Sequence, residues 1–199
     1  TTAINHVLKM YPQVIIHSKY KEKPFSLYQI TWIKLECPHD GSIKGLLYEF
    51  FTCVDRLVGT NYCVKAKNST IDMMITMMGT VIRNTCMGML IIDEIQHLSM
   101  AKSGGSEKML NFFVNLVNSI GIPVILVGTP NAVGLLQLEF RQARRNIGIG
   151  GNIVCDRLSK DAIWGILVNS IWRYQWIKNK TVLSDDINNV LYEETQGIP

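Results

Sequence analysis

The stretch GMLIIDEIQHLS, residues 88–99, decides the fold. Four apolar residues, 89–92, run directly into two adjacent carboxylates, Asp93 and Glu94. A short apolar run of this kind is typical of a strand that is buried on both faces of a sheet. An acid at the end of such a strand needs a partner, because the burial of an isolated charge is costly. A metal ion is one good partner; an acid pair that caps the following turn is the alternative.

The composition favours a globular protein with a sizeable core. The chain has 199 residues, of which 47% are hydrophobic and 18% are charged. This length suits one α/β domain, or one domain and part of a second. The net charge of +4 permits a nucleic-acid partner but does not require one. No apolar run reaches the roughly 20 residues of a membrane helix, so we expect no membrane partner.

The five cysteines indicate a reducing compartment. Their number is odd, they are widely spaced, and no C-x-x-C pair occurs. This argues against a disulfide framework or a zinc cage and predicts a cytoplasmic protein.

Apolar strands alternate with helical patterns along the chain. The periodicity predicts strands at residues 14–16, 28–37, 88–93, 123–128 and 153–158, and helices at 1–10, 43–58, 71–85, 107–120, 131–140, 160–178 and 185–195. The clustered methionines at 73–78 are expected to fill the core. Such alternation is typical of an α/β fold, in which helices flank a parallel sheet.

The ligand edge of such a sheet lies beyond the carboxyl ends of its strands. Asp93 and Glu94 fall on this edge, and so does Gly128-Thr129-Pro130-Asn131 after the strand at 123–128. This pattern resembles the Walker B arrangement of P-loop nucleotide hydrolases. In that arrangement Asp93 is the Mg²⁺ ligand, Glu94 is the general base, and Thr129 or Asn131 contacts the γ-phosphate or the attacking water. A simple Thr-Pro-Asn turn is the alternative for the last segment.

The glycine-rich loop that should hold the phosphates is absent from these residues. Its signature, G-x-x-x-x-G-K-[ST], leads directly into a helix, and this chain begins with Thr1-Thr2 at the start of a predicted helix. We therefore expect the glycines and the lysine to precede Thr1 in a longer protein. Thr1 would then bind Mg²⁺ through its hydroxyl, with Thr2 beside the nucleotide. The chain by itself should not hydrolyse ATP.

A resemblance to a known protein family rests on four segments and their order along the chain. These segments are TTAINHVL (1–8), ITWIKLECP (30–38), MLIIDEIQHLS (89–99) and IPVILVGTPNA (122–132). The chain resembles the TnsC/TniB-type AAA+ ATPases, regulators that select the targets of bacterial DNA transposons, with the TnsC branch as the nearer match. The resemblance implies an AAA+ core over 1–158 and the beginning of a helical lid over 159–199.

Several functional features are implied by this resemblance alone. Members of the group bind ATP and Mg²⁺ between subunits and assemble as rings or filaments on duplex DNA. They link a target-selection protein to the transposase subunits. A neighbouring subunit completes the site with an arginine, for which Arg144 and Arg145 best match the position. A solvated or DNA-facing basic cluster is the alternative for these arginines.

The resemblance also implies loops that contact DNA phosphates without reading sequence. The candidates are Lys65, Lys67 and Thr70 before the methionine-rich helix, and Lys102 after the strand at 88–93. Ordinary solvated lysines are the alternative. Neither loop contains an aromatic residue, which favours duplex DNA over the single strand that a helicase-loader-like ATPase would bind. A signalling-type P-loop scaffold without DNA binding is a further alternative.

Overall fold

The computed structural model describes residues 2–100, 112–113, 116, 120–130, 132 and 153–198, and of residues 98–100 the backbone alone. The contacts between residues divide the chain into two compact units, Thr1–Ile147 and Gly148–Pro199. The expected boundary between core and lid, after residue 158, stays a prediction.

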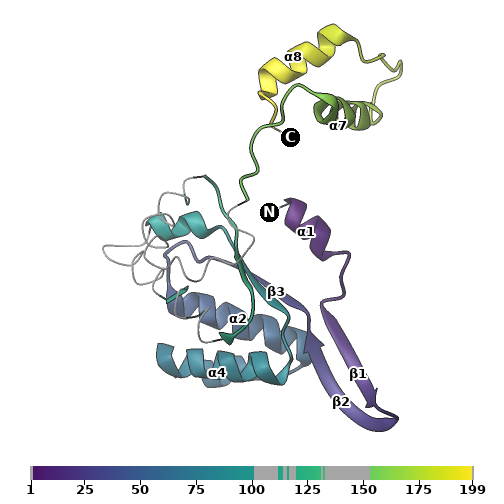
Figure 1. The fold of residues 1–199 in the computed structure, drawn as a ribbon. Helices are drawn as coiled ribbons and strands as arrows, with labels where there is room; N and C mark the ends of the chain where they lie inside the picture. The colour runs from purple at the N-terminus through teal and green to yellow at the C-terminus, as the bar shows by residue number, and fades with distance from the viewer. Residues whose placement is uncertain are drawn as a thin grey trace. The chain divides into compact units, whose positions relative to one another are not determined.

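A parallel sheet forms the centre of the first unit (Figure 1). Its strands are β3 (Trp32–Glu36), β4 (Met89–Asp93) and β5 (Val124–Leu126), in the order β3-β4-β5. Glu36 lies opposite Asp93 in the register between β3 and β4, so the two strands end at the same edge. This sheet, with the helices that flank it, confirms the predicted α/β fold of the P-loop type.

Two amphipathic helices, α2 (Ile43–Val58) and α4 (Ile71–Asn84), pack beside this sheet. The side chain of Ser42 accepts a hydrogen bond from the Gly45 N–H and so begins α2, which ends at Gly59 in the left-handed region. The core contains Phe50 and Phe51 from α2 together with Met74 and Met78 from α4, all fully buried. Met74 and Met78 therefore fill the core, as the sequence predicted, and Met77 packs partly buried against it. The prediction is wrong for Met73, which is 61% exposed.

The first unit also contains an antiparallel hairpin of β1 (Val14–Tyr20) and β2 (Lys23–Ile30), which follows the short helix α1 (Thr2–Leu8). Its turn consists of Lys21 and Glu22, both with positive φ, the geometry that two-residue hairpins favour. The predicted single strand at 28–37 is wrong. The chain changes partners at Thr31, because β2 pairs antiparallel with β1 while β3 pairs parallel with β4.

The second unit contains α7 (Ala162–Trp172) and α8 (Asp185–Thr195), where the sequence predicted helices. Trp164 of α7 packs edge-to-face on Tyr192 of α8, with ring centroids 5.1 Å apart. Its indole N–H donates to Asn188 at 2.8 Å. The two helices are therefore joined by a ring contact and a hydrogen bond.

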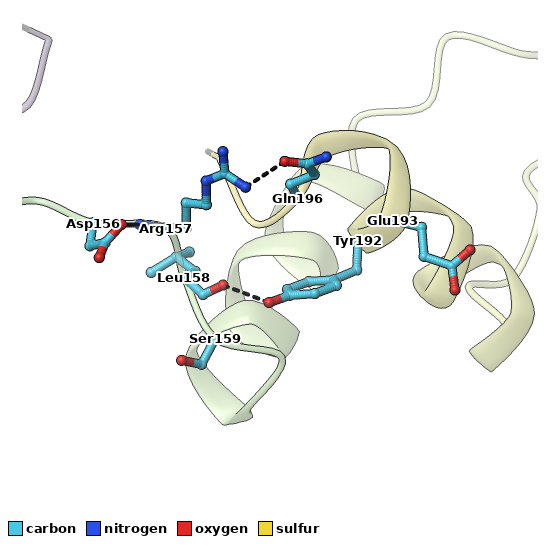
Figure 2. Close-up of a pocket in the computed structure, with 7 residues that line it drawn as sticks. All are labelled: Asp156, Arg157, Leu158, Ser159, Tyr192, Glu193 and Gln196. Atoms are coloured by element: carbon cyan, nitrogen blue, oxygen red, sulfur yellow. Dashed lines mark hydrogen bonds between the residues drawn. The ribbon is translucent and has the colours of Figure 1, made fainter.

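A cleft of about 440 Å³ lies where the segment before α7 meets the end of α8 (Figure 2). The Tyr192 hydroxyl donates to the Leu158 carbonyl, and the Leu158 N–H donates to the Gly197 carbonyl at 2.8 Å. The predicted strand at 153–158 is wrong, because these residues pair with none of the described strands. An apolar composition does not make a strand without a neighbouring strand to receive its hydrogen bonds.

Candidate functional site

Asp93 ends β4 at the carboxyl edge of the sheet, and its side chain is 1% exposed. Its Oδ2 lies 2.8 Å from Nζ of Lys34, and its Oδ1 accepts a hydrogen bond from the Glu94 N–H at 2.9 Å. Lys34 reaches Asp93 because it lies on β3 two residues before Glu36, the register partner of Asp93, and so faces the same side of the sheet. The lysine offsets the charge of the buried carboxylate.

Glu94 turns the chain away from β4 in an unusual backbone conformation. Its φ is +58°, in the left-handed region that side chains other than glycine rarely adopt. Such a conformation costs on the order of 1–3 kcal/mol and persists only where the surroundings hold it in place. The 3₁₀ helix η1 (Ile95–Met100) follows at once. The strained position thus coincides with the carboxylate that the sequence assigns as general base.

Gln96 connects Glu94 to the segment after β5. Its side-chain N–H donates to Oε2 of Glu94, and its Oε1 accepts a hydrogen bond from the Thr129 N–H at 3.1 Å. The backbone adds a second link, because the Ile95 N–H donates to the Val127 carbonyl at 3.1 Å. Asp93, Glu94 and Thr129 are therefore brought together at one edge.

Gly128 permits this close approach. A Cβ atom at Gly128 would lie 2.6 Å from Cγ1 of Ile95 and 2.9 Å from Oε1 of Gln96. Real Cβ atoms essentially never come this close to such neighbours, so a larger residue would displace η1 or the segment after β5.

Gln96 is the site residue that sequence reasoning missed. The sequence signal that could have identified Gln96 is its side-chain amide, two residues after Glu94 and at the beginning of a tight turn. Lys34 was missed as well, because its role depends on the register between two strands that are far apart in the sequence.

A histidine pair lies at the same edge. Nδ1 of His97 is 2.9 Å from the Cys37 carbonyl oxygen, and the rings of His39 and His97 are in tilted contact with centroids 4.1 Å apart. These contacts join η1 to the end of β3. Burial, with smaller contributions from Asp40 and Glu49, raises the pKa of the Cys37 thiol to about 11. The thiol therefore stays protonated at neutral pH and is a poor metal ligand.

The oxygen donors at this edge suit Mg²⁺ better than a metal ion that needs three or more protein ligands. Among the described residues, no group of three or more His, Cys, Asp or Glu side chains could hold a metal. Mg²⁺ commonly takes only one or two protein carboxylates and fills its shell with water and phosphate oxygens. Asp93, with Glu94 next to it, supplies oxygen donors of this kind.

The remaining predicted site residues lie elsewhere or outside the description. Thr2 begins α1 and is exposed. Lys65 lies in the short helix α3 (Tyr62–Ala66), and Lys67 follows it; both are exposed. The Thr70 hydroxyl accepts a hydrogen bond from the Met73 N–H and caps α4. The predicted residues that fall outside the described part of the chain are Thr1, Lys102, Asn131, Arg144 and Arg145.

Hydrogen bonds hold the beginning of α3, the helix that carries the candidate DNA-contacting residue Lys65. The Asp55 carboxylate accepts hydrogen bonds from the N–H groups of Tyr62 at 2.7 Å and Cys63 at 2.8 Å, at the beginning of α3. Lys65 also lines a groove of about 670 Å³ along α4, with Ser69 and Asp72 among the other lining residues. The position of Lys65 is thus determined by the contacts of α3 with the end of α2.

The parallel sheet, with its acid pair at the carboxyl edge, defines a P-loop NTPase-type domain. Residues 1–136, more than half of the chain, match a family model described as the AAA domain. The chain therefore belongs to this family of AAA ATPase domains. No match is found among curated proteins. In the part of the chain that the structure describes, no helix is long and apolar enough to cross a membrane.

Proposed function

We propose that this chain is the ATPase module of a regulator of DNA transposition in the bacterial cytoplasm. The regulator assembles as a homo-oligomer on duplex DNA and links a target-selection protein to the transposase subunits. The observation that carries the ATPase part is the connection of Glu94 through Gln96 to Thr129, beside Asp93, in an AAA domain. The transposition part is supported by the resemblance to the TnsC/TniB group.

Each residue at the edge has a distinct role in this proposal. Bound ATP with Mg²⁺ supplies the phosphoryl group and its charge neutralisation. Asp93 holds the metal ion, together with the Thr1 hydroxyl and with Thr2 beside the nucleotide. Glu94 orients and deprotonates the attacking water, within the geometry that Gln96 maintains. Thr129 or Asn131 contacts the γ-phosphate or the water.

Two other groups of residues complete the proposed assembly. Arg144 or Arg145 reaches the site of the adjacent subunit and stabilises the charge that develops during hydrolysis. Lys65, Lys67, Thr70 and Lys102 contact DNA phosphates. The exposure of Lys65, Lys67 and Thr70 supports this role, because all three are accessible to a large partner.

Nucleotide-dependent DNA binding by the full-length protein tests the proposal. Binding is measured with a non-hydrolysable ATP analogue, with ADP and without nucleotide, on duplex and single-stranded DNA over a range of salt concentrations. We expect duplex binding that requires the analogue, ignores sequence and weakens steeply with salt. A preference for single strands would favour a helicase loader instead. Nucleotide binding without DNA binding would favour a protein scaffold.

A further inference from the structure

The ion pair between Lys34 and Asp93 lies within the sheet rather than at the surface. The side chains of Lys34 and Asp93 are 14% and 1% exposed, and their charged atoms are 2.8 Å apart. The Glu94 N–H holds the other carboxylate oxygen. The proposed metal ligand therefore already has a cation next to it in this structure.

Lys34 lies on a face of the sheet that carries both apolar and acidic residues. On this face, β3 also carries Trp32 and Glu36, and β4 carries Met89, Ile91 and Asp93. A well-packed apolar pair in place of Lys34 and Asp93 would often be as stable as the buried ion pair. Packing alone therefore does not explain the charge of Lys34. Its contact with Asp93 indicates an electrostatic role at the proposed metal site.

We propose that Lys34 is a positioning residue that serves as the counter-ion of Asp93 in the metal-free protein and competes electrostatically with the metal. This inference rests on the proposed function, in which Asp93 holds Mg²⁺. A cation that approaches Asp93 is repelled by the Lys34 ammonium, because like charges in a site shielded from water interact strongly. Lys34 thus weakens metal binding, while its contact holds the Asp93 carboxylate in place between rounds of nucleotide binding.

The competition makes metal binding depend on the nucleotide. Asp93 alone, with its charge offset by Lys34, attracts a divalent cation weakly. The phosphates of a bound nucleotide add the negative charge that overcomes the repulsion. Lys34 would thus restrict metal binding at Asp93 to the nucleotide-bound protein.

The test is a metal titration of the full-length protein. Mn²⁺ replaces Mg²⁺ because its free form can be followed by electron paramagnetic resonance, at a saturating concentration of a non-hydrolysable ATP analogue. We expect Lys34→Met to lower the Mn²⁺ concentration for half-saturation by about tenfold. Lys34→Arg keeps the charge and should bind Mn²⁺ as the wild type does. Asp93→Asn should weaken binding, because the metal loses a carboxylate ligand.

Thermal unfolding provides a second readout. In EDTA, Lys34→Met should unfold at a lower temperature than the wild type, because the buried Asp93 carboxylate has lost the ion pair with Lys34. Mn²⁺ with the analogue should then raise the unfolding temperature of this variant by more than that of the wild type. If Lys34→Met does not fold, Lys34→Gln removes the same charge and the titration is carried out on that variant.

The outcomes separate the inference from the proposed function. If Lys34→Met needs as much Mn²⁺ as the wild type, or more, while Asp93→Asn binds it weakly, Lys34 is no competitor and only the inference is overturned. If Asp93→Asn also binds Mn²⁺ as the wild type does, the metal-ligand role of Asp93 fails and the proposed site fails with it.

Discussion

At the scale of single residues, the side chain of Gln96 holds the proposed general base. It contacts Glu94 on one side and the Thr129 N–H on the other. We expect Gln96→Leu to lower kcat for ATP about tenfold and to leave KM nearly unchanged, because the water-orienting group loses its geometry while nucleotide binding is retained. Steady-state kinetics of the full-length protein measure both constants.

Gln29→Leu is the matched control for Gln96→Leu. Gln29 contacts His17 within the β1–β2 hairpin, away from the carboxyl edge of the sheet. Its loss should leave kcat unchanged. A Gln96→Leu protein with the kcat of the wild type would show that Glu94 needs no such support.

Gly128 tests the packing between η1 and the segment after β5. Gly128→Ala would place a methyl group 2.6 Å from Ile95 Cγ1. We expect a loss of about 1–3 kcal/mol in the free energy of unfolding, together with reduced ATP hydrolysis. The comparison is Gly79→Ala within α4, whose added Cβ would meet, among the described residues, only the Arg83 side chain at an ordinary 3.5 Å. That change should stabilise by up to about 1 kcal/mol. Equal effects of the two substitutions in chemical denaturation would contradict the close approach.

At the scale of secondary structure elements, Asp55 fixes the beginning of α3. Burial raises the pKa of this carboxyl, but hydrogen bonds from the Cys63 N–H, the Thr60 hydroxyl and the Tyr62 N–H outweigh burial and lower it overall. The stabilisation is therefore present above the unfolded pKa of about 3.9 and is lost as the pH falls through the lower folded value.

Acid unfolding checks this assignment. Asp55→Asn should remove the contribution, so the difference in stability between wild type and variant should shrink as the pH falls below about 4. Urea titrations from pH 6 down to pH 2 measure it. A difference that stays constant over this range would mean that the Asp55 charge does not stabilise α3.

The sequence predicts elements better than it predicts their partners. Four apolar residues and two acids were enough to place β4, and the parallel sheet followed from alternation. The hairpin was missed because 28–37 alternates over most of its length and reads as one strand, whereas the change of partner at Thr31 depends on β1 and β4. Lys34 and Gln96 were missed for the same reason. Their contacts, with Asp93 on the next strand and with Thr129 beyond β5, arise only when the sheet is assembled.

At the scale of the whole molecule, we expect a DNA interface that does not depend on sequence. Lys65→Ala and Lys67→Ala should each weaken duplex binding and each lower the slope of log K against log salt by about 1, because each removes one phosphate contact. Lys180→Ala, at an exposed lysine of the second unit, is the control and should change neither quantity. Salt titrations by fluorescence anisotropy measure both. If both variants keep the wild-type slope, α3 and its neighbouring residues do not belong to the DNA interface.

The most direct test of the central claim, that Glu94 drives hydrolysis that releases the assembly, is the dwell time of full-length Glu94→Gln on duplex DNA. Complexes are formed with ATP and Mg²⁺, free protein is removed, and dissociation is followed for the variant and the wild type. General-base catalysis contributes about 10²–10⁴-fold, so the variant should hydrolyse ATP at least about 100-fold more slowly. It should stay bound as ATP-loaded oligomers while the wild type dissociates. A variant that leaves DNA as fast as the wild type would contradict the account.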